Sequence, residues 1–251
     1  MTAIIILAAG QGTRLKPFTD NTPKCMLPVH DRPILHWQLN AIRSLGITDI
    51  VVVGGYRNES IIAPDTVRIY NPEYRTTNII QSLWCARQRF STGFIMSYGD
   101  IVYNPDILKR LLDADGDICV VVDRAWKPYW NKRMDAILDD IESLSVNPDT
   151  GTIQSIGQEI RCLDEVEGQY IGLVAFRRTG IQKVREFMSK HSIAGMYGTG
   201  LLQGLINEGV SVTPVWIDGG WFEVDTMRDW TVAESISKVS VNILVIDGAD
   251  T

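Results

Sequence analysis

Short runs of consecutive aliphatic residues, separated by segments of helical periodicity, constrain the fold of this chain more than any other feature. The runs Ile4–Leu7, Ile50–Val53 and Ile118–Val122 consist of hydrophobic residues only, which is typical of strands buried on both faces. Pro33–Leu45 repeats apolar residues at helical spacing, and Gly46 ends that segment. This alternation predicts an α/β fold with a mostly parallel sheet that helices cover on both faces.

The same patterns extend over most of the chain, whose 251 residues suit one large domain. Further strands are expected at 67–70, 93–98, 170–176 and 210–217, and further helices at 78–90, 105–112, 182–191 and 227–239. Residues 123–169 are less regular and predict a small lid or insertion beside the sheet. We expect the domain to span residues 1–238. The apolar tail 239–251 is expected to add a strand or to contact a second copy in a homo-oligomer.

Charge and cysteine usage argue against several classes of protein. Lysine and arginine number 24 against 30 aspartates and glutamates, so the formal net charge is −6, whereas a general nucleic-acid binder needs a basic face. No apolar stretch reaches the roughly 18–20 residues of a membrane span, and no basic segment precedes the N-terminal apolar run as in a signal peptide. Four widely spaced cysteines favour reduced thiols and a cytoplasmic location. Three histidines leave little material for a zinc site.

The loop after the first strand is the first place to look for a binding site, because ligands of open α/β sheets lie at the carboxyl ends of the strands. From Leu7 to Pro17 it reads Leu-Ala-Ala-Gly-Gln-Gly-Thr-Arg-Leu-Lys-Pro. Small residues let a phosphate approach the backbone N–H groups. Arg14 offers a bidentate phosphate donor, and Lys24 adds a compact positive charge.

Spacing separates this loop from other phosphate-binding motifs. Gly10-x-Gly12 lacks the third Gly or Ala of the dinucleotide fingerprint, and the chain contains no G-x-x-x-x-G-K-[ST]. A lone Gly-x-Gly is usually a tight turn after a strand. The ordered appearance of Arg14, Pro17, Pro23-Lys24 and Pro28 argues against that simpler interpretation.

These residues together resemble the signature of the nucleotidyltransferases that activate sugar phosphates and small phosphorylated alcohols with a nucleoside triphosphate. The family pattern L-A-A-G-x-G-T-R-L-x-P-x-T, followed by P-K and L-P, is matched residue for residue between Leu7 and Pro28. The resemblance implies a Rossmann-like fold and Mg²⁺ as cofactor. It also implies attack of a phosphoryl oxygen on the α-phosphate, with release of pyrophosphate.

The resemblance further implies which residues act. Arg14 and Lys24 would stabilise charge on the reacting phosphates, and Asp100 and Asp225 would bind Mg²⁺. No general base is required, because the attacking oxygen is already ionised. The nucleotide would contact Leu7, Ala8, Ala9, Gly10, Gln11, Gly12, Thr13, Arg14, Asn78 and Ser82. Taken alone, the two aspartates are equally typical of turns and helix caps, as Asn78 is of a cap and Ser82 of packing.

Later motifs resemble the bacterial phosphocholine-type cytidylyltransferases, whose relatives load CMP onto phosphonates or phosphoglutamine. They are Asn71–Asn78 with Ser82–Trp84, Tyr98–Val102, Gly168–Leu173 and Trp221–Thr226. The resemblance implies CTP as donor and a small phosphonate or phosphate ester as acceptor. The acceptor would be of the phosphonoformate, phosphoglutamine, aminoethylphosphonate or phosphocholine type.

Acceptor-binding residues are expected mainly in and around the insertion; they are Lys24, Arg124, Trp126, Tyr129, Trp130, Arg133 and Tyr170. The aromatic residues could form a cage for a quaternary ammonium or a hydrophobic lid packed on the sheet. The cations of the insertion could bind an extra anionic group or remain solvated. Their number, with Lys127 and Lys132 included, favours an anionic acceptor.

Two other functions stay open. A sugar-1-phosphate nucleotidyltransferase is the nearer alternative, although Gly157-Gln158-Glu159 stands where sugar-activating relatives commonly place a lysine. A nucleotide-binding regulatory subunit without catalysis is the more distant one. The joint presence of Arg14, Lys24, Asp100 and Asp225 argues against it.

Overall fold

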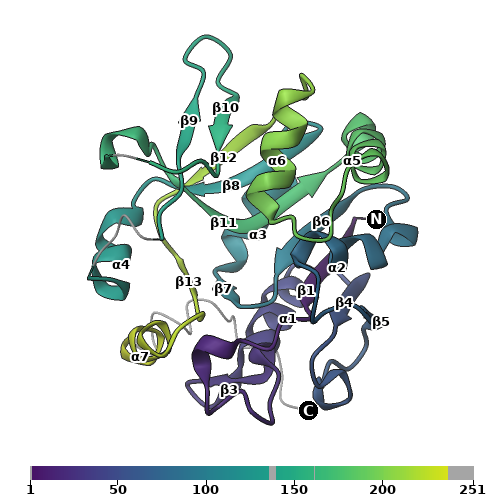
Figure 1. Ribbon diagram of the computed structural model, residues 1–251, viewed down its shortest axis with the longest axis vertical. Helices are drawn as coiled ribbons and strands as arrows, with labels where there is room; N and C mark the ends of the chain where they lie inside the picture. Colours follow the sequence, from purple (N-terminus) through teal and green to yellow (C-terminus); the bar gives the residue numbers. More distant parts are fainter. Residues whose placement is uncertain (1, 136–139, 161, 237–251) are drawn as a thin grey trace.

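A seven-stranded sheet runs through the computed structural model, which describes residues 2–135, 140–160 and 162–236 (Figure 1). In spatial order the strands are β12 (Thr213–Ile217), β8 (Ile118–Asp123), β11 (Gln169–Phe176), β6 (Phe94–Tyr98), β1 (Ala3–Ala8), β4 (Ile50–Gly54) and β5 (Val67–Tyr70). Neighbouring strands are parallel except at β11, which runs antiparallel to both β6 and β8. The expected α/β fold with a mostly parallel sheet is therefore confirmed.

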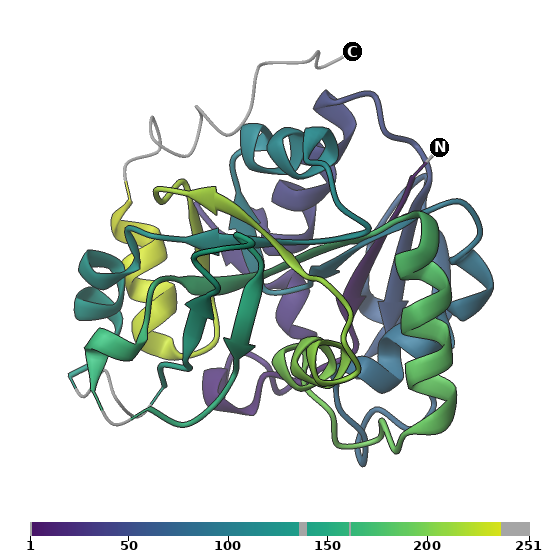
Figure 2. The same ribbon diagram turned by 90° about the horizontal axis from the view of Figure 1, so that it is seen from above.

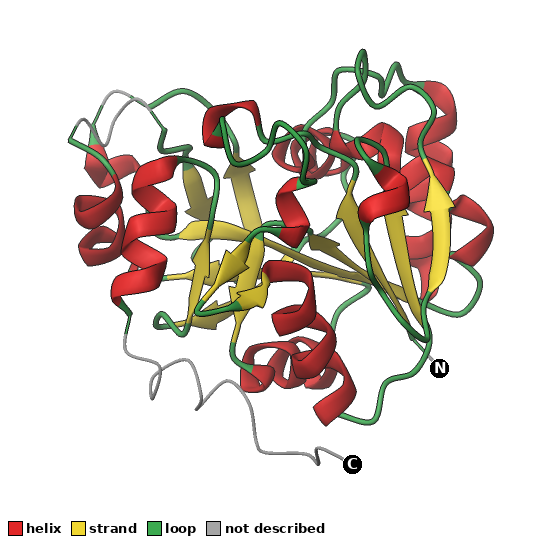
Figure 3. Ribbon diagram, turned by 90° about the horizontal axis from the view of Figure 1, so that it is seen from below, coloured by secondary structure: helices red, strands yellow, loops and turns green. Residues whose placement is uncertain are grey.

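Helices cover both faces of this sheet (Figures 2 and 3). Those on one face are α1 (Ile34–Ser44) and α3 (Pro105–Asp113), and those on the other are α2 (Ile79–Cys85), α5 (Arg178–Lys190) and α6 (Gly198–Asn207). Alternate side chains of β1 serve the two layers, because successive residues of a strand point to opposite faces. Ile4 and Ile6 pack in the core with α1 and α3, whereas Ile5 and Leu7 pack in the core with α2, α5 and α6.

A third, smaller apolar cluster holds the segments around the end of β1 together. It joins Leu15, Leu27 and Trp37 to Phe222 and Val224. The elements that contribute to it are α1, β2 (Pro28–Val29), β7 (Ile101–Tyr103), β13 (Trp221–Glu223) and α7 (Met227–Ser235). Strand β2 pairs with β3 (Arg32–Pro33) and β7 with β13, both antiparallel. The cluster brings residues about two hundred positions apart in the sequence to one end of the sheet.

The segment 123–169 contains regular structure that its sequence pattern does not reveal. It includes α4 (Trp126–Arg133) and the hairpin β9 (Leu144–Val146) and β10 (Ile153–Ile156), as well as the start of β11. Helix α6 was also not expected, because its Gly-rich start, Gly198-Thr199-Gly200, reads as a loop. The tail 239–251 lies outside the described residues, so its role stays a prediction. Within the described ranges, no helix is long and apolar enough to cross a membrane.

Candidate active site

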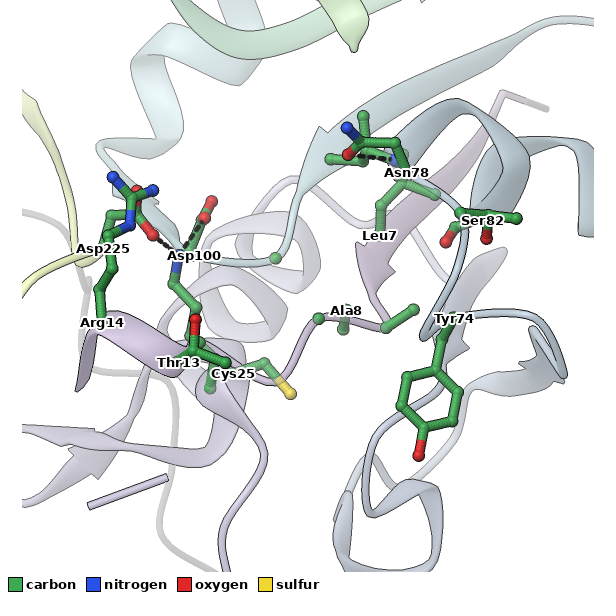
Figure 4. A pocket seen from close by; sticks show the side chains of 17 residues that line it. Leu7, Ala8, Thr13, Arg14, Cys25, Tyr74, Asn78, Ser82, Asp100 and Asp225 are labelled. Atoms are coloured by element: carbon green, nitrogen blue, oxygen red, sulfur yellow. Dashed lines mark hydrogen bonds and ion pairs between the residues drawn. The ribbon is translucent and has the colours of Figure 1, made fainter. Parts of the chain in front are cut away.

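A pocket of about 280 Å³ opens at the carboxyl ends of β1 and β6, where the α/β architecture favours ligand binding (Figure 4). Its walls come from the loop after β1, from the start of α2, and from the residues that follow β6 and β13. The lining residues are Leu7, Ala8, Ala9, Gly10, Gly12, Thr13, Arg14, Lys24, Cys25, Tyr74, Thr77, Asn78, Ile79, Ser82, Gly99, Asp100 and Asp225. Of the residues expected to contact the nucleotide, all but Gln11 line this pocket.

The loop after β1 is shaped to let Lys24 reach the pocket. Gly12 adopts a left-handed conformation, with φ of 72°, which favours glycine. A Cβ at Gly12 would lie 3.0 Å from the Cβ of Lys24, so the missing side chain leaves room for the lysine stem. The buried hydroxyl of Thr19 donates to the Gly12 carbonyl at 2.8 Å and fixes the turn. Two parts of the sequence signature thus support each other.

Asp100 reaches the pocket because Gly99 allows a close approach between two chain segments. A Cβ on Gly99 would lie 2.6 Å from the Leu7 carbonyl oxygen. The Gly99 N–H donates to that carbonyl at 3.0 Å. The end of β6 is therefore held against the end of β1, and Asp100 follows at once.

Two carboxylates and two cations meet at one end of the pocket, which Figure 4 shows around Asp100, Asp225 and Arg14. The Lys24 ammonium lies 2.6 Å from Asp100 Oδ2 and 2.6 Å from Asp225 Oδ1. Arg14 forms an ion pair with the other oxygen of Asp225. These four side chains come from three distant parts of the sequence, and the fold brings all of them together.

The carboxylate pair suits a divalent cation that substrate phosphates help to ligate. Asp100 Oδ1 is buried and has no hydrogen-bond partner among the described residues, so one oxygen remains for a further ligand. No group of three or more His, Cys, Asp or Glu side chains able to hold a metal occurs in the described part. Two carboxylates alone fit Mg²⁺ bound through nucleotide phosphates better than a metal held by protein groups only.

The opposite end of the pocket is formed by α2 and the turn before it. The Asn78 side chain accepts the N–H of Ile79 at 2.9 Å and caps the helix. Asn71 donates to Ser82 Oγ at 3.0 Å. Asn78 and Ser82 thus have structural partners and also line the pocket, near Tyr74 (Figure 4). Burial raises the pKa of Cys25 to about 12, so this lining thiol stays protonated and unreactive at neutral pH.

Most residues expected to bind the acceptor do not line this pocket. Trp126 and Trp130 are buried and form an aromatic cluster with Tyr129 and Trp221. Tyr170 is packed edge-on against Tyr98, with ring centroids 5.6 Å apart. These rings pack against one another and within or against the hydrophobic core. Lys24 is the one member of the expected acceptor set in the pocket lining.

Three cations of the insertion, Arg124, Lys127 and Arg133, have partners outside the pocket. Arg124 is paired with Asp218 at 2.9 Å on the surface. The ammonium of Lys127 lies 5.6 Å from the ring centroid of Trp126. The Arg133 side chain is 1% exposed and pairs with both Glu223 and Asp229. The number of cations in the insertion is therefore a poor guide to the net charge around a bound acceptor.

Asp123, the last residue of β8, has a structural role. It is buried and accepts hydrogen bonds from the N–H groups of Ala125 and Gly219 and from the Trp221 indole. Asp100 and Asp123 both lie near the carboxyl end of a strand, so this location does not distinguish a pocket aspartate from a structural one. The preceding glycine does, since Gly99 stands before Asp100 and Val122 before Asp123.

Asp229 belongs to the surroundings of the site and was not singled out from the sequence. It forms a capping box with Thr226 at the start of α7. The spacing Thr-x-x-Asp directly after Asp225 was an available signal for it.

Comparisons with known proteins agree with this geometry. Residues 4–191 match the family described as the MobA-like NTP transferase domain. A CTP:phosphoglutamine cytidylyltransferase of Campylobacter jejuni is 34% identical to this chain, covering 91% of it and 97% of that protein. A choline-phosphate cytidylyltransferase of Streptococcus pneumoniae is 23% identical, covering 93% and 97%.

Two solved structures share the fold. The inositol-1-phosphate CTP transferase from T. maritima superposes with a TM-score of 0.75 at 20% identity, covering 97% of this chain and 95% of that one. The CTP:phosphocholine cytidylyltransferase from Streptococcus pneumoniae gives 0.68 at 21% identity, covering 94% and 98%. These likenesses extend over almost the whole chain, so the fold has no large addition relative to either.

Proposed function

This chain belongs to the MobA-like NTP transferase family, and we propose that it transfers CMP from CTP to a small phosphorylated or phosphonate acceptor. The observation that carries the proposal is the group formed by Lys24, Asp100, Asp225 and Arg14 at the end of a pocket lined by the loop after β1. The choice of CTP is supported by the similarity to cytidylyltransferases over nearly the full chain.

The reaction needs electrostatic stabilisation more than acid–base catalysis. An anionic oxygen of the acceptor forms a bond to the α-phosphorus of CTP. The bond from that phosphorus to the oxygen bridging to the β-phosphate breaks, and pyrophosphate leaves with the electron pair. Lys24 and Arg14 stabilise the charge on the α-phosphate and the leaving group. Backbone N–H groups of the loop from Leu7 to Thr13 cradle the phosphates.

The metal site of the proposal consists of Asp100 and Asp225. A Mg²⁺ bound there with the triphosphate would neutralise charge on the reacting phosphates. Lys24 must move from its position between the carboxylates to reach a phosphate. Asn78, Ser82 and Tyr74 line the other end of the pocket and suit the cytidine part of the nucleotide.

For the acceptor we propose the phosphoglutamine type first, because the phosphoglutamine enzyme is 34% identical and the choline-phosphate enzyme 23% over similar shares of the chain. The lid cations add little support for an anionic acceptor, since Arg124 and Arg133 have carboxylate partners of their own. We also propose, from the cysteine pattern, that the enzyme works in the cytoplasm.

Pyrophosphate release tests the proposal. The purified protein is incubated with Mg²⁺, one nucleoside triphosphate and one acceptor, with phosphoglutamine, phosphocholine, 2-aminoethylphosphonate, phosphonoformate and glucose 1-phosphate compared side by side. We expect release with CTP and phosphoglutamine, and loss of about a hundredfold or more in Asp100→Ala. Turnover of UTP or dTTP with glucose 1-phosphate, and none of CTP, would assign the sugar-activating alternative. CTP binding without release for any acceptor would point to a non-catalytic protein.

A further inference from the structure

Asp225 is held from both sides by residues that do not line the pocket. It lies in the short link between β13 and α7. Asp229, fully buried in the first turn of α7, accepts the backbone N–H of Asp225 at 3.1 Å and that of Thr226 at 2.8 Å through Oδ2. The position of the Asp225 backbone therefore depends on the Asp229 carboxylate.

The position of the Asp229 carboxylate depends in turn on Arg133, a residue of helix α4. Helix α4 packs against α7 (Figure 1). Arg133 Nε donates to Asp229 Oδ1 at 2.7 Å. A buried carboxylate without a counter-charge would be strongly destabilised. The Arg133 guanidinium supplies that counter-charge and donates a hydrogen bond to the same carboxylate that accepts the two backbone N–H groups.

Arg133 also reaches the other flank of Asp225. It forms an ion pair with Glu223, the last residue of β13. Tyr129, one turn earlier on α4, accepts the Glu223 N–H at 2.9 Å and donates to the Glu223 carbonyl at 3.2 Å. The guanidinium lies over the Tyr129 and Trp130 rings, 5.2 and 4.8 Å from their centroids. Arg133 thus links Glu223, two residues before Asp225, to Asp229, four residues after it.

We propose that Arg133 is a positioning residue for Asp225: acting through Asp229 and Glu223, it holds the Asp225 carboxylate where it can bind the metal together with Asp100. This inference rests on the proposed function, because it assumes a metal at Asp100 and Asp225. Groups that orient metal ligands from outside commonly change metal affinity or activity by about 10–100-fold when removed. The arginine of the lid thus serves the reaction centre without touching either substrate.

The test separates metal affinity from folding. Arg133→Lys keeps the charge and loses the guanidinium fork that bridges the two carboxylates. Tyr129→Phe keeps the ring beneath the guanidinium and loses the two bonds to Glu223. The matched control is Arg228→Met, which removes a surface link between the same two helices, namely the ion pair to Asp135 at 2.7 Å and the bond to the Lys132 carbonyl at 2.9 Å.

Two readouts are taken for each folded variant. One is the Mn²⁺ dissociation constant, measured by electron paramagnetic resonance with a non-reactive CTP analogue bound. The other is the Mg²⁺ concentration that gives half-maximal pyrophosphate release. For Arg133→Lys we expect both values to rise about tenfold, and for Tyr129→Phe we expect a smaller rise. Both variants should recover most of the wild-type kcat at saturating metal. The control should keep wild-type values.

The outcomes distinguish this inference from the proposed function. A variant that is only partly folded would release pyrophosphate more slowly at every metal concentration, but its half-saturating Mg²⁺ concentration would not change. If the Mn²⁺ dissociation constant and the half-saturating Mg²⁺ concentration are both unchanged in Arg133→Lys and Tyr129→Phe, the positioning role is overturned. An equal shift in Arg228→Met would overturn it as well. A wild-type protein that releases no pyrophosphate, or needs no divalent metal, would instead defeat the proposed function on which the inference rests.

Discussion

The Lys24 ammonium and the Asp100 carboxylate lie 2.6 Å apart, and the same ammonium is 2.6 Å from Asp225. The lysine thus stands between the two carboxylates proposed to bind the metal. One positive charge cannot share this position with a divalent cation without strong repulsion. Lys24 and Arg14 together balance the charges of the two carboxylates, and we expect the metal to enter together with the nucleotide, whose phosphates draw the lysine away.

Metal binding without nucleotide tests this relationship. Lys24→Met removes the competing charge, so we expect Mn²⁺ to bind the free variant about tenfold more tightly than the free wild type, while turnover falls about a hundredfold or more. Equilibrium Mn²⁺ titration measures the first effect. Lys16→Met, at an exposed lysine paired with Asp20, is the control. Unchanged affinity in Lys24→Met would contradict the competition.

Gly99→Ala should damage both stability and activity. The added Cβ would lie 2.6 Å from the Leu7 carbonyl oxygen, so β1 and the turn before Asp100 must separate. We expect unfolding to become easier by about 1–3 kcal/mol and turnover to fall because Asp100 shifts. Urea denaturation and pyrophosphate release measure the two effects. Gly195→Ala, where the added carbon meets nothing within 4 Å, should leave both near wild type.

Trp126 is predicted to support the fold without recognising the acceptor. Its side chain is almost fully buried in the main core, so Trp126→Ala should lower the free energy of unfolding by about 3–5 kcal/mol. The milder Trp126→Phe should remain folded and keep the wild-type KM for the acceptor. A several-fold rise in that KM, with the KM for CTP unchanged, would instead support an aromatic cage for the acceptor.

The start of α5 should show a pH-dependent stability. Bonds from Thr179 and Arg178 hold the pKa of Asp117 below its ordinary value of 3.8. Because the pKa is lower in the folded state, the ionised carboxylate stabilises the fold above about pH 3.8, and this stabilisation is lost as the pH falls through the folded pKa. Asp117→Asn should therefore destabilise the protein at pH 7 by about 0.3–1 kcal/mol and by less at pH 3.

Denaturation at the two pH values measures this effect. Asp113→Asn is the control, because its exposed ion pair with Lys109 within one helix contributes little to stability. An Asp117→Asn effect of equal size at both pH values would mean that the hydrogen-bond geometry, and not the carboxylate charge, stabilises this end of the helix.

The sequence predicted the elements with strong local signals. The strands at Ile4, Ile50 and Ile118 and the helix after Pro33 occur within one or two residues of the expected bounds. Helices α4 and α6 were not predicted from the sequence, and the reason is physical. In α4, apolar and charged residues follow no single face, and α6 has glycine at its first and third positions. Tertiary packing therefore decides both helices.

Arg133 shows where sequence reasoning about the site reaches its limit. In the sequence it is one of several cations in a loop-like segment, and the same letters suit a solvated charge or an acceptor ligand. Which of these it becomes depends on whether α4 packs beside α7, and that depends on β13 crossing to β7. No local pattern contains this information.

The sequence by itself determined the α/β architecture, because hydrophobic period is a property of neighbouring residues. Its resemblance to the nucleotidyltransferase signature pointed to the loop from Leu7 to Arg14 and to Lys24, Asp100 and Asp225 as the residues of the site. Only the tertiary structure decided that Lys24 lies between the two carboxylates and that Arg133 is buried behind Asp225. Such contacts join residues up to about two hundred positions apart, and the free energy of burying a charge depends on the partners that the whole fold supplies.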